Sequence, residues 1–282
     1  MAAADPFEGV SAHYGRADLT DLILDALRAA GKDLNALTAE DIAPYTHLTG
    51  RPRVATVELA RLAGLQPGMA VLDLGSGLGG PARTLATEFG CQVTGLELTE
   101  RFVRTAQLLT ERVGLVDRVR FQHGNALDMP FDDARFDVVW HEQFAMHIPG
   151  KERLYGEVRR VLRPDGRLAL REFFAGPEQP LHYPVPWTTD GTISFLWPTD
   201  DVRALLARLG FTQLAWADLT TIDLERRQAA AAAGPDAGPT PPSGGALFQR
   251  ARGDNWTQIQ QNLGRNYAEK RLEIAQAVFQ RA

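Results

Sequence analysis

Apolar residues in the first part of the chain recur at helical spacing. This spacing predicts three helices, over residues 19–30, 38–44 and 52–64. Thr38, followed three residues later by Asp41, is a capping signature for the second helix, which we expect to end near Pro44. The first and third helices each stop at a glycine. We therefore expect residues 1–65 to form a helical cap that precedes the first strand.

Short apolar runs then alternate with further helical patterns. The runs predict five strands, over residues 69–75, 91–98, 118–124, 136–142 and 166–174. The helical patterns cover residues 81–90, 99–115 and 151–166. Pro81 falls in the first turn of one helix, and Thr99 is the expected cap of the next. This order predicts a parallel sheet with helices on both faces, and ligands at the carboxyl ends of the strands.

The last part of the chain is less regular. It predicts a helix over residues 198–210, capped by Thr199 or Asp200, then a strand over 211–220 and a helix over 255–271. Residues 229–245 are low in complexity and rich in Ala, Gly and Pro, so we expect them to be mobile. Periodicity alone does not assign residues 272–280.

Composition narrows the class of protein. Of the 282 residues, 44% are hydrophobic and 23% are charged, as in soluble globular proteins. The net charge of −5 argues against nucleic acid as a partner. We expect a cytoplasmic protein without a membrane partner, since we find neither a signal-peptide pattern nor an apolar stretch of membrane-spanning length. The single cysteine, Cys91, excludes a disulfide framework and a cysteine-built metal site, and we expect it to be a buried structural thiol.

Four glycines follow the first predicted strand: Gly75, Gly77, Gly79 and Gly80. The spacing Gly-x-Gly-x-x-Gly is the fingerprint of a dinucleotide site, whereas Gly-x-Gly-x-Gly behind an acidic residue fits S-adenosylmethionine. Asp73 favours the second template, because a carboxylate beside a pyrophosphate loop would place negative charge next to negative charge. S-adenosylmethionine carries an ammonium group and a sulfonium and no phosphate. Glu97 can accept hydrogen bonds from the ribose of either cofactor, so it does not discriminate between the two kinds of site.

Five blocks together resemble a class I S-adenosylmethionine-dependent methyltransferase. They are "VLDLGSGLGG", "VTGLELTERFV", "GNALDMPF", "FDVVWHEQFAMHI" and "RVLRPDGRL", which follow the family's order and spacing over about residues 50–220. Within the family the chain is most similar to small-molecule enzymes of the sarcosine and dimethylglycine or ubiquinone-biosynthesis type, including bacterial natural-product enzymes. The resemblance implies a Rossmann-like seven-stranded α/β sheet whose final strand is antiparallel, and we assign residues 272–280 to that strand. It also implies S-adenosylmethionine as cofactor and S-adenosylhomocysteine as product.

The resemblance divides the chain into a helical cap (1–65), a cofactor-binding core (66–220) and a helical insertion that ends in the final strand (221–282). It also assigns cofactor contacts: Gly75, Gly77 and Gly79 to the methionine part, Asp73 to its amino group, Glu97 to the ribose, Leu98 to the adenine face, and Asn125, Ala126 and Leu127 to the adenine edge. Gly80 is left for close helix packing. The chain departs from the family pattern at two positions. Asn125 stands where an Asp is usual, and Asp165 replaces a usual Gly in the turn before the fifth strand.

Methyl transfer from a sulfonium needs alignment, desolvation and an unprotonated nucleophile, with no fixed triad. The first candidates for substrate contact follow the fourth predicted strand: His141 as a base, Glu142 as a second catalytic group, and Gln143. The alternative is that His141 only lines the cofactor pocket and Glu142 caps the next turn. His147 is expected to be a packing or surface residue.

Aromatic residues outside these blocks are candidates for substrate contact. His13 and Tyr14 are expected as lid residues or as part of the surface. We expect an apolar wall of the substrate pocket to be formed by four aromatic residues that follow the fifth strand: Tyr183, Trp187, Phe195 and Trp197. Arg51 is expected either at the methionine carboxylate or in solvent.

The sequence therefore predicts an enzyme that transfers a methyl group to a nitrogen, oxygen or carbon of a small metabolite. Two alternatives remain, a cofactor-binding protein that catalyses a cyclisation or rearrangement and a non-catalytic cofactor-binding subunit. An oxidoreductase requires that Asp73 be tolerated beside a pyrophosphate. The acceptor and the oligomeric state are not determined by these patterns.

Overall fold

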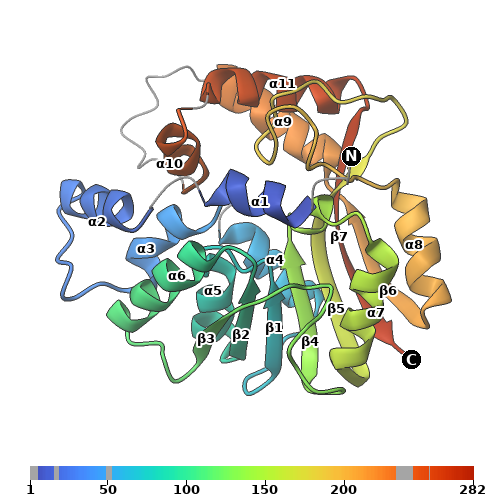
Figure 1. Ribbon diagram of the computed structural model, residues 1–282, viewed down its shortest axis with the longest axis horizontal. Coiled ribbons are helices and arrows are strands. Elements are labelled where there is room, and N and C mark those ends of the chain that lie inside the picture. The colour runs from blue at the N-terminus through green and yellow to red at the C-terminus, as the bar shows by residue number, and fades with distance from the viewer. Residues whose placement is uncertain (1–5, 16–18, 49–52, 233–243, 254) are drawn as a thin grey trace.

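Seven strands form one mixed sheet at the centre of the molecule (Figure 1). The computed structural model describes residues 6–15, 19–48, 53–232, 244–253 and 255–282. The strands are β1 (Ala70–Leu74), β2 (Gln92–Glu97), β3 (Val119–His123), β4 (Phe136–Glu142), β5 (Leu162–Ala175), β6 (Phe211–Asp218) and β7 (Leu272–Arg281). Their order is β3-β2-β1-β4-β5-β7-β6. The first five strands in this order are parallel, and β7 is antiparallel to β5 and β6. The α/β fold and the final antiparallel strand are both confirmed.

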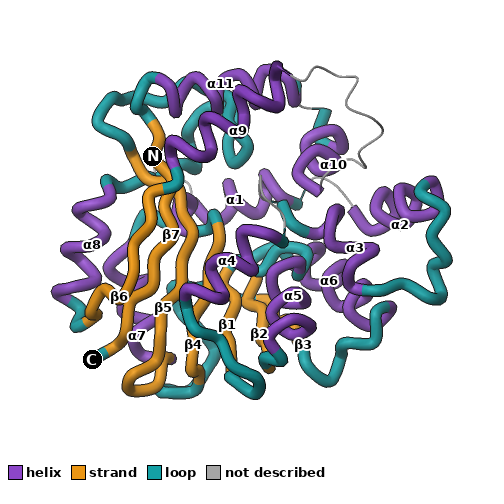
Figure 2. The backbone as a smooth tube through the Cα atoms, turned by 180° about the vertical axis from the view of Figure 1, so that it is seen from behind, coloured by secondary structure: helices purple, strands orange, loops and turns teal. Residues whose placement is uncertain are grey.

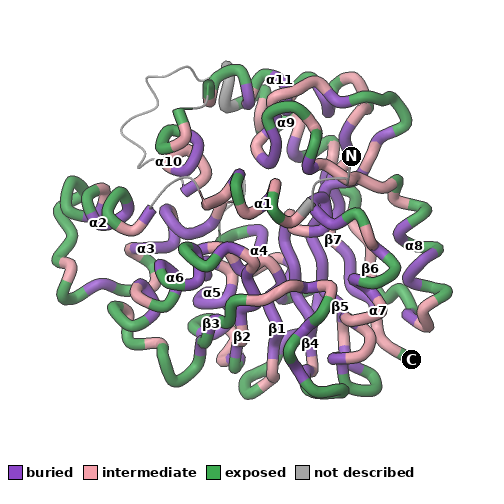
Figure 3. The backbone as a smooth tube through the Cα atoms, in the orientation of Figure 1, coloured by how far each residue is buried: buried purple, intermediate pink, exposed green. Residues whose placement is uncertain are grey.

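Successive residues of the strands point to opposite faces, and helices cover both faces. Val71, Val138 and Trp140 pack with α4 (Val54–Leu62), α5 (Gly80–Phe89) and α6 (Glu100–Arg112). Leu72 and Val139 pack with α7 (Lys151–Val161) and α8 (Thr199–Arg208) on the other face. Figure 2 shows α4 and α5 on the first face, and Figure 3 shows that burial is concentrated in the strands. The continuous apolar runs of β1 and β4 follow from burial on both faces.

A second group of helices lies at the edge of the sheet where the parallel strands end. It comprises α1 (Pro6–Tyr14), α2 (Leu19–Ala29), α3 (Ala39–Thr46), α9 (Thr220–Ala232), α10 (Gly244–Ala251) and α11 (Trp256–Ala268). Figure 1 shows α1 crossing above β1 and β4, with α9 and α11 above α1. The sequence patterns did not predict α1, α9 or α10. Of the segment expected to be mobile, residues 233–243 lie outside the described residues, while its first alanines continue α9 and its last two glycines begin α10.

The expected helix boundaries are confirmed in part. Thr38 and Asp41 form the capping box of α3, although that helix continues through Pro44 to Thr46. Thr99 precedes α6 but makes no side-chain cap. The predicted cap of α8 is wrong, because Pro198 occupies the cap position and Thr199 instead donates a hydrogen bond of 3.0 Å to Glu273.

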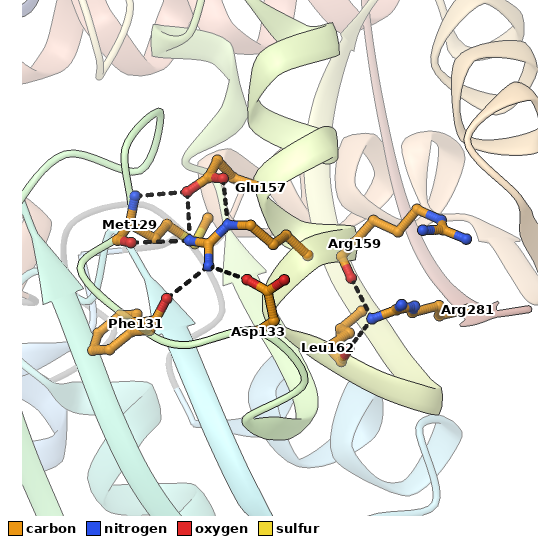
Figure 4. Close-up of polar contacts among 8 residues, drawn as sticks. Met129, Phe131, Asp133, Glu157, Arg159, Leu162 and Arg281 are labelled. Carbon is orange, nitrogen blue, oxygen red and sulfur yellow. Dashed lines mark hydrogen bonds and ion pairs between the residues drawn. The ribbon is translucent and has the colours of Figure 1, made fainter.

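Two arginines join elements near the amino ends of β4 and β5 (Figure 4). Arg160 on α7 contacts Glu157, Asp133 and the carbonyl oxygens of Met129 and Phe131. These bonds hold the loop that follows β3. Arg281 donates to the carbonyl oxygens of Arg159 and Leu162, and so joins the end of β7 to the end of α7 and the start of β5.

The fifth strand begins earlier than expected, so that Asp165 lies within β5, where the register with β4 shifts between Leu162 and Arg167. Asp165 adopts φ +62° there, a conformation that glycine usually supplies, whereas the single cysteine is as expected. Cys91 is fully buried, and burial raises the pKa of its thiol to about 11. The thiol is therefore protonated at neutral pH, as a structural cysteine should be.

Candidate active site

A cavity of about 890 Å³ lies at the carboxyl ends of β1, β2 and β4. Its floor consists of the glycine loop after β1, the end of β2 with the following residues, and the loops after β3 and β4. Its roof consists of residues from α1, α9, α10, α11 and the loop that follows β5. This is the edge of a parallel sheet at which ligands are expected.

The glycine loop borders the cavity at two of its four glycines. Gly75 and Gly77 line the cavity and have φ of +65° and +53°. Gly79 does not line the cavity, and a Cβ there would lie 2.4 Å from Phe121 and 2.7 Å from Arg83. Gly79 is therefore closely packed, and its cofactor contact stays a prediction. Gly80 packs closely on α3, where a Cβ would lie 2.7 Å from the carbonyl oxygen of Thr46.

Three buried carboxylates converge on the floor: Asp73, Glu97 and Glu142. Burial, with Glu142 and Glu97 nearby, raises the pKa of Asp73 well above its usual range. Burial also raises the pKa values of Glu97 and Glu142. Asp73 Oδ2 and Glu142 Oε2 have no hydrogen-bond partner among the described residues. This region favours a ligand that brings positive charge or hydrogen-bond donors.

Glu97 is held in a fixed orientation by the backbone. Its Oε2 accepts a hydrogen bond of 2.9 Å from Gly77 N, and its Oε1 accepts one of 2.8 Å from Thr99 N. Two backbone donors occupy only part of the acceptor capacity of a carboxylate. Glu97 can therefore still accept two hydroxyl groups.

The predicted adenine contacts are brought together in part. Leu98, Asn125 and Ala126 line the cavity, whereas Leu127 does not. Leu127 instead donates its backbone N–H to Asn125 Oδ1 over 2.8 Å. The Asn125 oxygen therefore retains one lone pair for a ligand.

His141 does not reach the cavity, although its neighbours do. Glu142 and Gln143 line the cavity, while His141 is 0% exposed beneath them. His141 Nδ1 lies 2.6 Å from Glu172 Oε1, which also accepts from the backbone N–H groups of Phe144 and Ala145. This arrangement orients the loop after β4 and gives His141 no path to a substrate. The alternation of side chains along a strand accounts for the difference, because His141 and Glu142 face opposite sides.

Glu142 is not the cap that the alternative interpretation proposed. Its Oε1 accepts hydrogen bonds from Thr56 Oγ1 at 2.7 Å and from Trp140 Nε1 at 3.2 Å. Among the described residues, neither of these donors is a backbone N–H of the turn that follows β4.

Tyr14 and His147 meet at the cavity, a pairing that the sequence patterns did not predict. Tyr14 Oη lies 2.9 Å from His147 Nε2, and His147 Nδ1 lies 3.0 Å from the carbonyl oxygen of Ile193. A carbonyl only accepts, so Nδ1 carries the proton, and Nε2 accepts from the Tyr14 hydroxyl. Burial lowers the pKa of His147 to about 4, which keeps the ring neutral at pH 7. Desolvation and the Glu97 carboxylate raise the pKa of Tyr14.

Aromatic packing explains the position of Tyr14. Its ring stacks on Phe248 of α10 at 5.2 Å between centroids and contacts Phe102 of α6 edge-on. His13 does not line the cavity, since its Nε2 contacts Arg252 instead. Tyr14 was expected as a lid residue, and the only sequence signal for its partner was the spacing of His147 after β4.

The aromatic wall is formed by fewer of the predicted residues. Trp187 lines the cavity and stacks on Phe173 at 4.7 Å. Tyr183, Phe195 and Trp197 do not line it. Phe173 belongs to β5, so the sequence pattern marked it only as a strand residue. Arg51 lies outside the described residues.

Within the described ranges, no group of three or more His, Cys, Asp or Glu side chains is arranged to hold a metal ion. In the same part of the chain, no helix combines the length and the apolar character needed to cross a bilayer.

Residues 72–170 match the family model described as a methyltransferase domain. Over 115 residues the chain is 43% identical to a sterol 24-C-methyltransferase of Gibberella zeae, covering 41% of this chain and 30% of the relative. Over 127 residues it is 40% identical to the 27-O-demethylrifamycin SV methyltransferase of Amycolatopsis mediterranei, covering 44% and 47%. The chain thus spans less than half the length of these curated relatives.

Solved structures share the fold over most of the chain. A geranyl diphosphate methyltransferase in complex with S-adenosylmethionine superimposes with a TM-score of 0.64 at 19% identity, covering 82% of this chain and 85% of the other. The [4+2]-cyclase SpnF superimposes with a TM-score of 0.63 at 23% identity, covering 94% and 93%. Residues 72–170 therefore match a methyltransferase domain, and the fold around them is shared with these solved structures.

Proposed function

We propose that the protein transfers the methyl group of S-adenosylmethionine to a small-molecule acceptor by direct displacement. The observation that carries the proposal is the group of three buried carboxylates beside the glycine loop. The orphaned oxygens of Asp73 and Glu142 suit a cofactor with an ammonium group and a sulfonium, whereas a pyrophosphate would add negative charge. Bound S-adenosylmethionine supplies an electrophilic methyl group and a leaving group that becomes neutral.

The floor residues hold the cofactor in this proposal. Glu97 binds the ribose hydroxyls with its remaining lone pairs, and Asp73 faces the amino group. Leu98 and Ala126 contact the adenine, and Asn125 accepts from its amino group. Gly75 and Gly77 let the loop approach the methionine part without a side chain in the way.

Tyr14 and His147 provide the route for the acceptor's proton, in the place first proposed for His141. The lone pair of His147 Nε2 points at the Tyr14 hydroxyl, and both residues line the cavity. As an acceptor hydroxyl attacks the methyl group, its proton passes to the Tyr14 oxygen while the Tyr14 proton passes to His147. One proton leaves the acceptor and one arrives on Nε2, so the methylated product is neutral.

Gln143 keeps the substrate contact that the sequence suggested, whereas Glu142 takes a different role from the catalytic one first predicted for it. Both line the cavity from the loop after β4. In this proposal Gln143 contacts the acceptor and Glu142 faces the cationic part of the cofactor.

The relatives support a lipid or natural-product type of acceptor. One is named for a sterol and another for a rifamycin. We place the reaction in the cytoplasm, where the one thiol, Cys91, would remain reduced.

Calorimetry and isotope transfer test the proposal. S-adenosylhomocysteine should bind and a nicotinamide dinucleotide should not, and the opposite preference would refute the cofactor assignment. Labelled methyl from S-adenosylmethionine should appear in a product when metabolites are screened. Cofactor binding with a rearranged, unlabelled product would instead support the cyclase alternative. Binding with no turnover of any tested substrate would support the non-catalytic subunit.

A further inference from the structure

Gln249 on α10 places an unpaired amide oxygen at the roof of the cavity. Its side chain is buried, with the residue 3% exposed, and lines the cavity. Gln249 Nε2 donates a hydrogen bond of 2.8 Å to the carbonyl oxygen of Pro186. A carbonyl only accepts, so this bond fixes which end of the amide is nitrogen. Gln249 Oε1 is then left without a partner among the described residues.

The surroundings of Gln249 define the kind of group that would fit. Trp187 and Phe173 form an apolar wall of the same cavity, together with Leu263 from α11. Phe248, the residue before Gln249, stacks on Tyr14, so this part of the roof adjoins the proposed proton route. A ligand here buries apolar surface and needs one hydrogen-bond donor for the amide oxygen.

Charge distinguishes between a hydroxyl and an ammonium group as that donor. Arg226 and Arg227 line the roof, and both bind Asp223, at 2.7 Å and 3.0 Å. The acidic side chain on this helix face is therefore already neutralised by two cations. The three lining carboxylates belong to the floor. A neutral donor is favoured over a cation at the roof.

We propose that Gln249 is a specificity-determining residue that accepts a hydrogen bond from a hydroxyl group on an otherwise apolar methyl acceptor. The inference rests on the proposed function and adds the chemical class of its substrate. Gln260 offers a matched comparison in the same cavity, because its Oε1 already accepts a bond of 2.9 Å from Arg227. Of these two roof amides, Gln249 has the unpaired oxygen.

Two probes of matched shape test the subsite, 2-naphthol and 2-methylnaphthalene. Their affinities are measured by calorimetry on the full chain, with and without saturating S-adenosylhomocysteine. The wild-type protein should bind 2-naphthol about tenfold more tightly, the worth of one neutral hydrogen bond. Equal affinities in the wild-type protein would overturn the proposal without the need for any variant.

Three variants locate the hydroxyl preference. Gln249→Met should abolish it and leave the affinity for 2-methylnaphthalene unchanged, whereas Gln260→Met should retain it. Gln249→Glu keeps an acceptor oxygen but loses the donor to Pro186, and it should also retain the preference. A preference that survives in Gln249→Met, or is lost in Gln249→Glu, would refute the role of the amide oxygen. Failure of the proposed function would appear separately, as absence of S-adenosylhomocysteine binding or of labelled-methyl transfer.

Discussion

The floor and the roof of the cavity differ in charge and in the way the chain builds them. The floor comes from loops that directly follow parallel strands, and its buried carboxylates suit a cationic cofactor. The roof comes from helices near both ends of the chain, and it presents aromatic rings, amides and two arginines. Local geometry fixes the floor, whereas the roof depends on packing between distant segments. In the proposed function, the floor recognises the cofactor and the roof recognises the acceptor.

Removing the Glu97 carboxylate should produce the largest effect. Glu97→Ala deletes two charge-assisted hydrogen bonds to the ribose, each worth about 1.5–3 kcal/mol, so cofactor affinity should fall by about 1,000-fold. Calorimetry with S-adenosylhomocysteine measures the loss. Gln249→Met, a roof variant, should bind S-adenosylhomocysteine normally. Equal losses in the two variants would remove the distinction between floor and roof.

Tyr14→Phe should separate turnover from binding. The variant keeps the ring that stacks on Phe248 and removes only the hydroxyl that contacts His147. If Tyr14 and His147 carry the proton, kcat for a hydroxyl acceptor should fall by about 100-fold, the usual worth of general-base catalysis. S-adenosylhomocysteine affinity should stay unchanged. An unaltered kcat, measured with labelled methyl, would show that the proton leaves by another route.

Asp73→Asn should weaken cofactor binding while it stabilises the free protein. Burial and two neighbouring carboxylates disfavour the charged form of Asp73, so its neutral replacement should raise the free energy of unfolding by about 1 kcal/mol. Cofactor affinity should fall by about tenfold, because one charge that faces the amino group is lost.

Urea denaturation and calorimetry measure the two effects of Asp73→Asn. Asp223→Asn is the control of opposite sign, since Asp223 is a buried partner of Arg226 and Arg227 and its loss should lower stability. A drop in stability for Asp73→Asn would mean that the floor is not electrostatically strained.

The pH dependence of stability should reveal the neutral state of His147. Its pKa is about 4 in the folded protein, below the ordinary value of about 6.5 in an unfolded chain. As pH falls through this window the unfolded state takes up the proton first, so stability is complete above pH 6.5 and declines toward pH 4.

His147→Gln should remove about 1 kcal/mol of that decline between pH 6.5 and 5.5. Burial also lowers the pKa of His47 to about 4. His47 should therefore still contribute to the loss of stability at low pH in the variant. Denaturation curves of both proteins across this range provide the check. If the free energy of unfolding fell equally with pH in the wild-type protein and in His147→Gln, the neutral acceptor role of His147 would be contradicted.

Sequence patterns predicted the floor well because its geometry is local. The floor residues lie at the ends of two adjacent strands, with Gly75 and Gly77 directly after β1 and Glu97 at the end of β2. Pairing of Leu74 with Leu96 places those ends side by side. The same local logic placed Gly79 and His141 at the cavity, which neither of them lines. Their positions depend on Phe121, Arg83 and Glu172, which come from other elements.

The roof was predicted only in part. Tyr14 and Trp187 were expected at the substrate side, but His147 and Gln249 were not identified as functional. Helices α9 and α10 carry weak periodic signals next to a segment of low complexity, and their stability comes from tertiary contacts. Phe248, for example, packs in one cluster with residues of α2, α3 and α6.

By itself the sequence determined the alternation of the five parallel strands with the helices between them, the glycine loop and the acidic residues around it. Each of these depends on neighbours a few positions away, where periodicity and backbone conformation are readable. Tertiary structure alone decided that Tyr14 and His147, 133 positions apart, form a hydrogen bond, and that the Gln249 oxygen lacks a partner among the described residues. Such facts depend on which donors and acceptors meet after the chain has closed, and this is not encoded in any short stretch of residues.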